Sequence, residues 1–239
     1  MNIALLTAAG VGNRMGQDIP KQFMHIDNCP VIIYTMLAFQ HCDEIDAIAV
    51  VCLKGWEVML RSYANQYSID KLNWIFEGAD TNQGSIENGV MGLKNSGCSD
   101  DDIILVHDGV RPLVSNEIIH NNIEVCKQYG YAVTGLTCKE AIMELIGECV
   151  HQIEIPRERL IRTQTPHTYR LRTLIDAHKE ARKIGVRNTV ASCTLLSILG
   201  VDNQCFVKGS EKNGLKLTNP EDVELFKSMK NTDPEPWMK

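Results

Sequence analysis

The residues best suited to chemistry stand in short segments that are far apart in the sequence. The first is "LLTAAGVGNRMGQDIPKQF", in which Gly10 and Gly12 are followed by the cations Arg14 and Lys21. Small residues let backbone N–H groups approach a ligand closely, and such groups bind anions. Nearby cations stabilise charge that develops on a phosphorus centre and its leaving group. The segment therefore favours a loop that encloses a nucleoside triphosphate.

A dinucleotide-binding loop is the alternative, because Gly10-Val11-Gly12 followed by Gly16 nearly spells that fingerprint. That fold places an acidic residue near the end of the second strand, roughly 20 residues past the glycines, where it binds a ribose. Here the second predicted strand ends in "VVCLKGW", with Lys54 at that place, and Pro20 interrupts the region where a helix would start. Both features speak against an NAD-dependent oxidoreductase. A plain strand-to-helix turn is the remaining interpretation.

Three further segments could contribute to the same site. In "VHDGVRP", Asp108 directly follows a buried strand, so it could hold Mg²⁺ against phosphates or simply cap a turn. We expect the neighbouring His107 to be a structural hydrogen-bonding group rather than a base. The segment "GADTNQGSI" offers small polar groups that could read a base, although a helix N-terminus has the same composition. The segment "GLKLT" predicts a strand that carries Lys216.

Apolar runs alternate with segments of helical period, and this alternation predicts the fold. Strands are expected at 3–7, 47–53, 73–76, 103–106 and 131–136, and helices at 31–41, 56–67, 83–94 and 116–129. Strands spaced by helices of this length form βαβ units, so we predict an α/β fold with a mostly parallel sheet flanked by helices. Ligands bind beyond the carboxyl ends of the strands in such a sheet, which places the first three segments at one edge.

The alternation of strand and helix patterns is interrupted at 137–155. There "TCKEAIMELIGECVHQIEI" contains two strand-like runs around Gly147-Glu148. This pattern predicts a hairpin that protrudes as a β-arm, and the unpaired edges of such an arm need cover. A second copy of the chain could supply that cover, so we expect a homodimer. Helices at 171–184 and 189–199, a strand near 205–207 and a last helix that starts at Asn219-Pro220 complete the chain. We expect residues 1–239 to form a single domain.

Length, charge and cysteine content restrict the class of protein. The chain has 239 residues, which suits one sizeable core, and its formal charge of −6 argues against partners such as nucleic acid or an anionic membrane. No run reaches the roughly 18 apolar residues of a membrane span. The nine cysteines form no C-x-x-C pair, so we expect buried thiols in a reducing cytoplasm rather than a metal or redox centre.

Taken together, the segments resemble a known family. "AAGVGNRMGQDIPKQF", "EGADTNQGSI", "VHDGVRP", "IPRERLIRTQTPHTY" and "NGLKLTNPEDVELF" occur in order across almost the whole chain. The combination is similar to cytidylyltransferases that act on methylerythritol 4-phosphate or ribitol 5-phosphate. This resemblance implies a Rossmann-like nucleotidyltransferase fold, a β-arm that builds a homodimer, and Mg²⁺ dependence. It also implies transfer of CMP from CTP to a sugar-alcohol phosphate, with release of pyrophosphate.

The resemblance further implies roles for single residues where the motifs match. Contacts to the nucleotide would come from Ala8, Ala9, Gly10, Gly12, Asp80, Ser85 and Gly109. The catalytic cations would be Arg14, Lys21 and Lys216, and Asp108 would ligate Mg²⁺. The second substrate would be bound by Arg111, Arg157 and Thr165, with Arg157 reaching across a dimer interface.

Some positions depart from the pattern of the family, mainly where the second substrate would bind. Relatives usually have other residues at the positions of Asn82, Ala141, His167 and Ala191. The segments "HDGVRP" and "CLKGW" resemble the ribitol phosphate branch, which serves teichoic acid or capsule polymers, more than the methylerythritol branch of isoprenoid synthesis. We therefore expect ribitol 5-phosphate as the acceptor. Methylerythritol 4-phosphate and a non-catalytic nucleotide-binding relative remain the alternatives.

Overall fold

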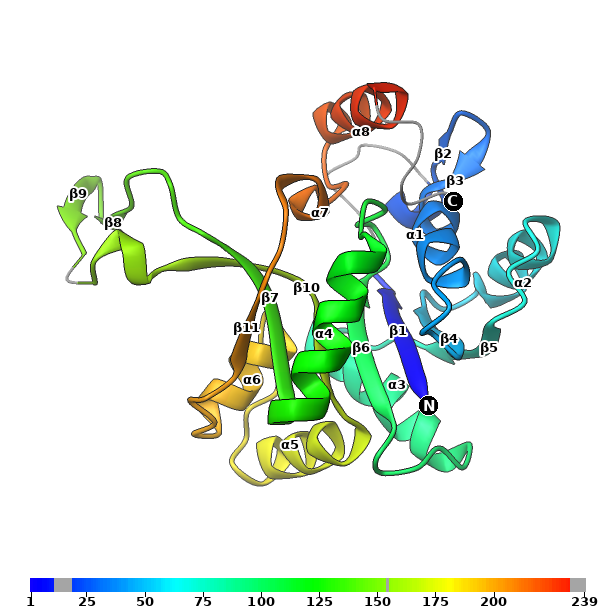
Figure 1. Ribbon diagram of the computed structural model, residues 1–239, viewed down its shortest axis with the longest axis horizontal. Coiled ribbons are helices and arrows are strands. Elements are labelled where there is room, and N and C mark those ends of the chain that lie inside the picture. The colour runs from blue at the N-terminus through cyan, green and yellow to red at the C-terminus, as the bar shows by residue number, and fades with distance from the viewer. Residues whose placement is uncertain (11–18, 154, 233–239) are drawn as a thin grey trace.

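A seven-stranded sheet forms the centre of the computed structural model, which describes residues 1–10, 19–153 and 155–232 (Figure 1). Its strand order is β11-β7-β10-β6-β1-β4-β5. The strands are β1 (Asn2–Ala8), β4 (Ala47–Cys52), β5 (Leu72–Glu77), β6 (Ile103–Asp108), β7 (Tyr131–Thr137), β10 (Ile161–Arg170) and β11 (Cys205–Lys208). Only β10 runs antiparallel to its neighbours in this sheet. The predicted α/β fold with a mostly parallel sheet is confirmed.

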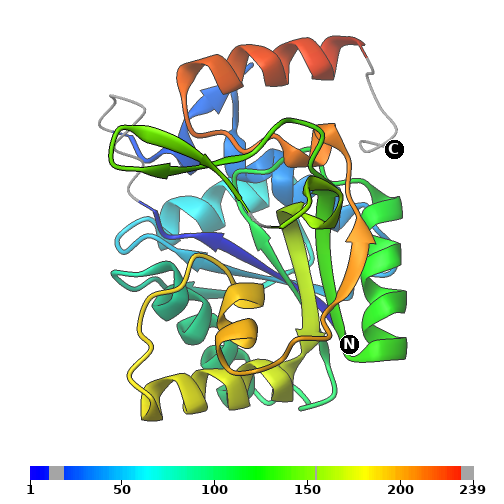
Figure 2. The same cartoon turned by 90° about the vertical axis from the view of Figure 1, so that its left-hand side faces the viewer.

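Helices cover both faces of the sheet, and Figure 2 shows α3 and α4 on opposite sides of the strands. The helices are α1 (Val31–Gln40), α2 (Glu57–Gln66), α3 (Asn82–Asn95), α4 (Asn116–Tyr129), α5 (Leu171–Lys183), α6 (Ser192–Ile198), α7 (Glu211–Gly214) and α8 (Pro220–Thr232). Neighbouring side chains of a strand point to opposite faces. Accordingly, Ala4 and Leu6 belong to the apolar cluster that contains α1 and α4, whereas Ile3 and Leu5 belong to the cluster that contains α3 and α5.

Local sequence signals account for several helix boundaries. Ser115 accepts a hydrogen bond from the Ile118 backbone N–H at the start of α4, and Gly130 ends that helix in the left-handed conformation. Pro220 begins α8, where the carboxylate of Asp222 accepts a hydrogen bond from the Asn219 N–H. Both starts agree with the prediction from the sequence.

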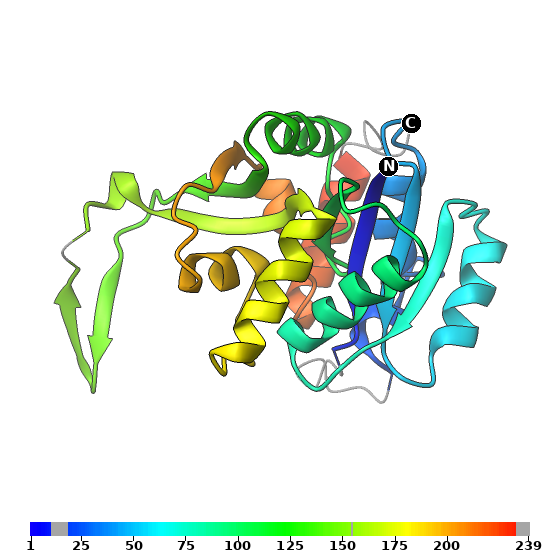
Figure 3. The ribbon, with the colours of Figure 1, turned by 90° about the horizontal axis from the view of Figure 1, so that it is seen from below.

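The β-arm is a two-stranded antiparallel sheet formed by β8 (Met143–Ile146) and β9 (Cys149–Gln152). Gly147 turns between them with a φ of 63°, and every residue of both strands is exposed. Figures 1 and 3 show the arm standing away from the body of the chain. The predicted hairpin is therefore confirmed.

Strand β10 was not predicted from the sequence, although it lies inside the sheet between β7 and β6. It contains Pro166, which cannot donate to a strand partner and argues against a central strand. The structure resolves the conflict with an irregular register between Thr163 and His167, and the Pro166 carbonyl accepts a hydrogen bond from Thr134 Oγ1 at 2.7 Å. Tertiary pairing thus overrides the local signal.

Two predictions near the C-terminus were wrong in detail. The predicted strand around Lys216 does not form: α7 ends at Gly214, and 215–218 has no regular structure. Its backbone is tied to the body by the Leu217 N–H, which donates to the Val110 carbonyl at 2.9 Å. The helix predicted at 189–199 begins only at Ser192.

A small hairpin near the N-terminus, formed by β2 (His25–Ile26) and β3 (Cys29–Pro30), was also not predicted.

Two further predictions concern membrane-spanning segments and the state of the cysteines. Within the described residues, no helix combines the length and apolarity that crossing a bilayer requires. All cysteines are free, and those other than Cys149 and Cys205 are buried, which agrees with their predicted role as small apolar side chains.

Candidate functional site

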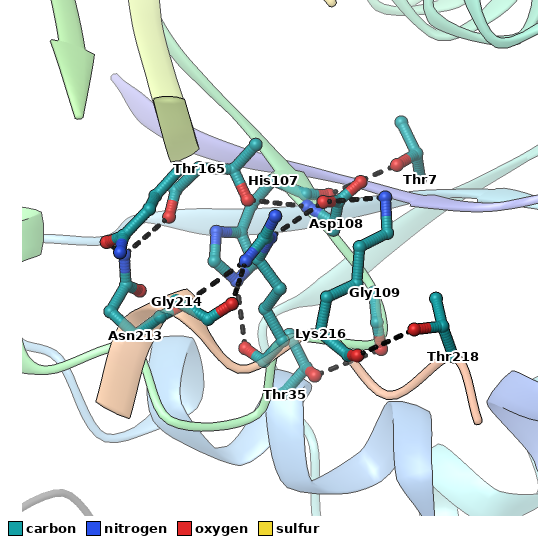
Figure 4. Close-up of polar contacts among 12 residues, drawn as sticks. Thr7, Thr35, His107, Asp108, Gly109, Thr165, Asn213, Gly214, Lys216 and Thr218 are labelled. Carbon is teal, nitrogen blue, oxygen red and sulfur yellow. Dashed lines mark hydrogen bonds and ion pairs between the residues drawn. The ribbon is translucent and has the colours of Figure 1, made fainter. Parts of the chain in front are cut away.

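The carboxyl ends of β1 and β6 meet at one edge of the sheet, where Thr7 lies beside Asp108 in the parallel register. Because β10 runs in the opposite direction, its beginning reaches the same edge. There the Asp108 N–H donates to Thr165 Oγ1 at 3.1 Å, as Figure 4 shows. One hydrogen bond thus joins two residues that are 57 positions apart in the sequence. This edge is the place at which the predicted site residues converge.

Asp108 forms ion pairs with two cations at this edge. Its Oδ2 atom lies 2.8 Å from Arg111 Nε and 3.1 Å from Lys216 Nζ. Arg111 also donates through Nη1 to the Gly214 carbonyl at 2.6 Å, which fixes the segment before Lys216. Burial by itself would raise the pKa of Asp108, but Lys216 and Arg111 outweigh it and hold this pKa well below its usual range. The carboxylate is therefore ionised at any physiological pH.

On one side of Asp108 lies a cavity of about 380 Å³, which we call the glycine-loop cavity. Its lining contains five of the residues predicted to contact the nucleotide, namely Ala8, Ala9, Gly10, Asp80 and Ser85. It also contains Lys21 and Lys216, which were predicted as catalytic cations, and Asp108, which was predicted as the Mg²⁺ ligand. Gln22 and Val110 also line this cavity. A site that combines small residues of the loop after β1 with two lysines suits a phosphate-bearing ligand.

Two buried side chains, Gln22 and Ser85, hold the backbone of residues that line this cavity. Gln22 donates through Nε2 to the carbonyls of Ala8 at 2.7 Å and Gly10 at 3.1 Å, and so holds the loop after β1. The hydroxyl of Ser85 accepts from the Ala79 N–H at 3.0 Å and donates to the Ala79 carbonyl at 3.2 Å. The sequence pattern predicts a role for Ser85 but not for Gln22, whose position directly after Lys21 was the available signal.

On the other side of Asp108 lies a second cavity of about 430 Å³, which we call the β10 cavity. Of the residues predicted to bind the second substrate, it contains Arg111 and Thr165. Three positions that depart from the family pattern, Asn82, His167 and Ala191, lie in the same lining. Both cavities share Thr7, Asn82, Asp108 and Lys216. The two cavities therefore meet at the Asp108–Lys216 pair.

Two buried histidines stand beside this junction. His107 contacts the Arg111 carbonyl through Nε2 at 3.0 Å and packs edge-on against Phe39. Burial lowers the pKa of His107 to about 4, so it is neutral and structural, as expected. Burial likewise lowers the pKa of His167 to about 4, which leaves a neutral ring in the lining of the β10 cavity.

Some predicted site residues lie elsewhere. Gly109 lines neither cavity: its N–H donates to the Thr7 carbonyl at 2.9 Å, and its role in this structure is close packing between strand and helix. Arg157 is exposed in the short 3-10 helix Arg157–Arg159 at the base of the arm, where Nη1 donates to the Lys139 carbonyl at 3.1 Å. It does not reach the cavities of its own chain. Gly12 and Arg14 lie outside the described residues.

The donor set at the junction is compatible with Mg²⁺. This ion usually binds proteins through one or two carboxylates and completes its shell with substrate phosphates and water. Asp108 supplies one carboxylate at the border of both cavities. In the described part of the chain, Arg111 and Lys216 both form their ion pairs with its Oδ2 atom. No group of three or more His, Cys, Asp or Glu side chains is suited to a metal in these same residues. The site therefore fits an ion brought in with a nucleotide rather than an all-protein cage.

Comparison with known proteins agrees with this geometry. "Ribitol-5-phosphate cytidylyltransferase" of Lacticaseibacillus paracasei is 39% identical over 230 residues, covering 95% of this chain and 97% of the relative. "2-C-methyl-D-erythritol 4-phosphate cytidylyltransferase" of Clostridium novyi is 31% identical over 230 residues, covering 95% and 96%.

A similar fold occurs in the crystal structure of 4-diphosphocytidyl-2C-methyl-D-erythritol synthase from Anaerococcus prevotii. That structure has a TM-score of 0.78 at 21% identity and covers 96% of this chain and 97% of its own. The family model IspD, described as 2-C-methyl-D-erythritol 4-phosphate cytidylyltransferase, matches residues 2–229. The chain is therefore a nucleotidyltransferase that belongs to the IspD family.

Proposed function

We propose that this chain transfers CMP from CTP to ribitol 5-phosphate and releases pyrophosphate. The observation that carries this proposal is the meeting of two cavities at Asp108 and Lys216. One cavity would hold the nucleotide, and the other would hold the acceptor phosphate. A reaction that joins two phosphates needs such a shared border, with positive charge placed where the reacting oxygens approach each other.

Ribitol 5-phosphate is the acceptor that the relatives favour. The ribitol-5-phosphate cytidylyltransferase relative is 39% identical, whereas the methylerythritol phosphate relative is 31% identical over the same length. The β10 cavity contains His167 and Ala191 at positions where the family pattern differs, which agrees with an acceptor other than methylerythritol 4-phosphate. The product would be CDP-ribitol, a precursor suited to cytoplasmic synthesis of teichoic acid or capsule polymers.

In the proposed reaction a phosphate oxygen of ribitol 5-phosphate attacks the α-phosphorus of CTP in line. The new oxygen–phosphorus bond forms as the bond from the α-phosphorus to the bridging oxygen breaks, and pyrophosphate leaves with that electron pair. No protein nucleophile is needed. Lys21 in the glycine-loop cavity and Lys216 at the junction would stabilise charge on the α-phosphate and the leaving group. Arg14 is proposed to act with them.

Asp108 is proposed to hold Mg²⁺, which when bound would neutralise phosphate charge and orient the triphosphate. The pairing of Asp108 with Arg111 and Lys216 keeps the carboxylate ionised and therefore ready to bind a cation. Thr165 Oγ1, which accepts from the Asp108 N–H, would keep the backbone of this carboxylate in place.

The β-arm is proposed to join two copies of the chain. Leu145 is 69% exposed and Val150 66% exposed, and they lie opposite each other in the hairpin. Such an apolar pair on a free hairpin would be covered by a second copy. In that arrangement Arg157, at the base of the arm, would reach the β10 cavity of the second copy and bind the acceptor phosphate.

The decisive experiment measures pyrophosphate release from CTP with Mg²⁺ and a panel of acceptors, together with the mass of the nucleotide product. We expect turnover and CDP-ribitol with ribitol 5-phosphate, and little turnover with methylerythritol 4-phosphate or glycerol 3-phosphate. Preference for methylerythritol 4-phosphate would overturn the acceptor assignment. Binding of CTP without turnover on any acceptor would instead identify a non-catalytic relative.

A further inference from the structure

Residues 188–191 form one wall of the β10 cavity, and they belong to the 186–191 loop, which is part of the connection between α5 and α6. The loop contains no helix or strand, and Thr189, Val190 and Ala191 all line the cavity. A backbone segment without regular structure needs hydrogen bonds from neighbouring elements to keep one conformation. The groups that donate to this loop therefore decide the shape of the wall against which an acceptor would lie.

Three consecutive side chains at the start of α3 supply those hydrogen bonds. Each donates to a different backbone carbonyl of the loop. The pairs are Thr81 Oγ1 with the Arg187 carbonyl at 3.3 Å, Asn82 Nδ2 with the Val190 carbonyl at 3.1 Å, and Gln83 Nε2 with the Val186 carbonyl at 2.9 Å. We call this arrangement the α3 clasp.

The clasp overlaps the glycine-loop cavity, because Thr81 and Asn82 also line that cavity. Ala79 and Asp80, which line that cavity, directly precede the clasp residues in the sequence. Thr81 is also the N-cap of α3, because its hydroxyl accepts from the Gly84 N–H at 3.0 Å. The first turn of α3 is therefore a rigid link between the wall of one cavity and the wall of the other.

Gln83 is the clasp residue with the clearest positioning role. It is 5% exposed and lines neither of the two cavities, so it has no contact with a ligand held in them. Its Oε1 atom has no hydrogen-bond partner among the described residues, which leaves donation to Val186 as its recorded polar contact. Farther along the helix, the ion pair of Glu87 with Arg182 at 2.6 Å ties α3 to α5 as well.

We propose that Gln83 is a positioning residue for the acceptor, because its hydrogen bond to Val186 fixes the 186–191 loop as a wall of the β10 cavity. This inference rests on the proposed function, in which the β10 cavity takes ribitol 5-phosphate. Loss of the bond loosens the wall and weakens acceptor binding. The glycine-loop cavity keeps its own contacts, so CTP binding is retained.

The test is the variant Gln83→Met, which keeps the length of the side chain and removes its donor. We expect the KM for ribitol 5-phosphate to rise about three- to tenfold, the scale of one net hydrogen bond. The KM for CTP and kcat at saturation should stay within about twofold. The matched control is Asn88→Ala on the same helix, whose amide donates to the Glu77 carbonyl at 3.0 Å and not to the loop. That variant should leave the acceptor KM unchanged.

Hydrogen exchange gives a second readout that does not depend on turnover. Peptides that cover 185–192 should exchange faster in Gln83→Met than in the unmodified chain, while peptides from the middle of α3 should not change. Equal losses for CTP and acceptor, or faster exchange throughout α3, would show a merely structural role and overturn the proposal. So would an unchanged acceptor KM together with unchanged exchange of the loop.

The same design separates failure of this inference from failure of the proposed function. An unmodified chain that gives no product with ribitol 5-phosphate contradicts the acceptor assignment. The clasp is then judged by exchange of the 185–192 peptides alone. A chain that turns over normally but shows no change in Gln83→Met contradicts only the role of Gln83.

Discussion

The Nζ atom of Lys216 lies 3.1 Å from the Oδ2 atom of Asp108, an ion pair that Figure 4 draws, and both side chains line both cavities. One cation and one anion therefore stand at the border between the two proposed substrates. The lysine side chain is 39% exposed, whereas that of Asp108 is 19% exposed, so the lysine is the more accessible partner. Lys216 is therefore well placed to leave the Asp108 carboxylate and pair with a phosphate oxygen of a substrate.

Replacing this lysine tests its proposed role in the transition state. Lys216→Met should lower kcat for pyrophosphate release by about 10²–10³, the scale for one lost transition-state donor. Asp108 keeps its ion pair with Arg111, so the melting temperature should change little. The matched control is Lys54→Met, since Lys54 also pairs with a carboxylate, that of Glu77 at 3.0 Å, but is 78% exposed. Equal activity of the two variants would contradict the assignment.

Lys21 should be catalytic rather than structural. It lines the glycine-loop cavity and is only partly buried. We expect Lys21→Ala to reduce turnover by about 10²–10³ while the thermal unfolding transition stays cooperative and near that of the unmodified chain. Parallel rate and melting measurements check this. A collapsed transition would mean that the lysine holds the fold instead.

The two glycines near the site should respond differently to an added methyl group. A Cβ on Gly109 would lie 2.6 Å from Ile32 Cδ1 and 3.0 Å from the Thr7 carbonyl, so Gly109→Ala should destabilise the fold by about 1–3 kcal/mol. Among the described residues, a Cβ on Gly10 would meet nothing within 4 Å. Gly10→Ala should therefore preserve stability and weaken CTP binding, because it blocks close approach to the backbone. Denaturant titration and CTP binding distinguish the two.

His178 should make the fold sensitive to acid. It is buried, and both ring nitrogens have no partner among the described residues. Burial lowers its pKa from 6.5 to about 4, so between these values the unfolded chain binds a proton that the folded chain does not. The stability from this group is complete above pH 6.5 and is lost as the pH falls toward 4.

The variant His178→Leu isolates this contribution. Its free energy of unfolding should fall less than that of the unmodified chain between pH 6.5 and 4, by up to about 3 kcal/mol. His107 and His167 also have lowered pKa values, so part of the slope should persist. Urea titrations across this pH range provide the measurement. Identical slopes for the two chains would exclude a neutral buried imidazole at this position.

The exposed apolar pair of the arm should hold two copies together. The double variant Leu145→Asp, Val150→Asp places charges on both strands of the hairpin and should yield monomers by sedimentation. It should also raise the KM for the acceptor if Arg157 acts across the interface. Glu144→Ala, one residue away in β8, is the control and should leave the oligomeric state unchanged. Dimers in the double variant would contradict the proposed role of the arm.

Local sequence determined much of this structure. Alternating strand and helix patterns predicted the parallel part of the sheet, because apolar period and turn residues act over a few neighbours. The hairpin around Gly147 and the start of α8 at Pro220 followed for the same reason. Residue types also predicted which side chains could serve phosphate chemistry, among them Lys21, Asp108 and Lys216, since charge and loop composition are visible without coordinates.

Only the tertiary structure decided how these residues meet. β10 carries Pro166 in a central strand, and its pairing with β6 brings Thr165 to the backbone of Asp108. The α3 clasp arises in the same way, since nothing near Gln83 in the sequence reveals that Val186 will lie against it. A hydrogen bond between distant segments depends on the packing of whole layers. The residue types alone therefore predicted phosphate chemistry, whereas long-range contacts determined the shape of the β10 cavity.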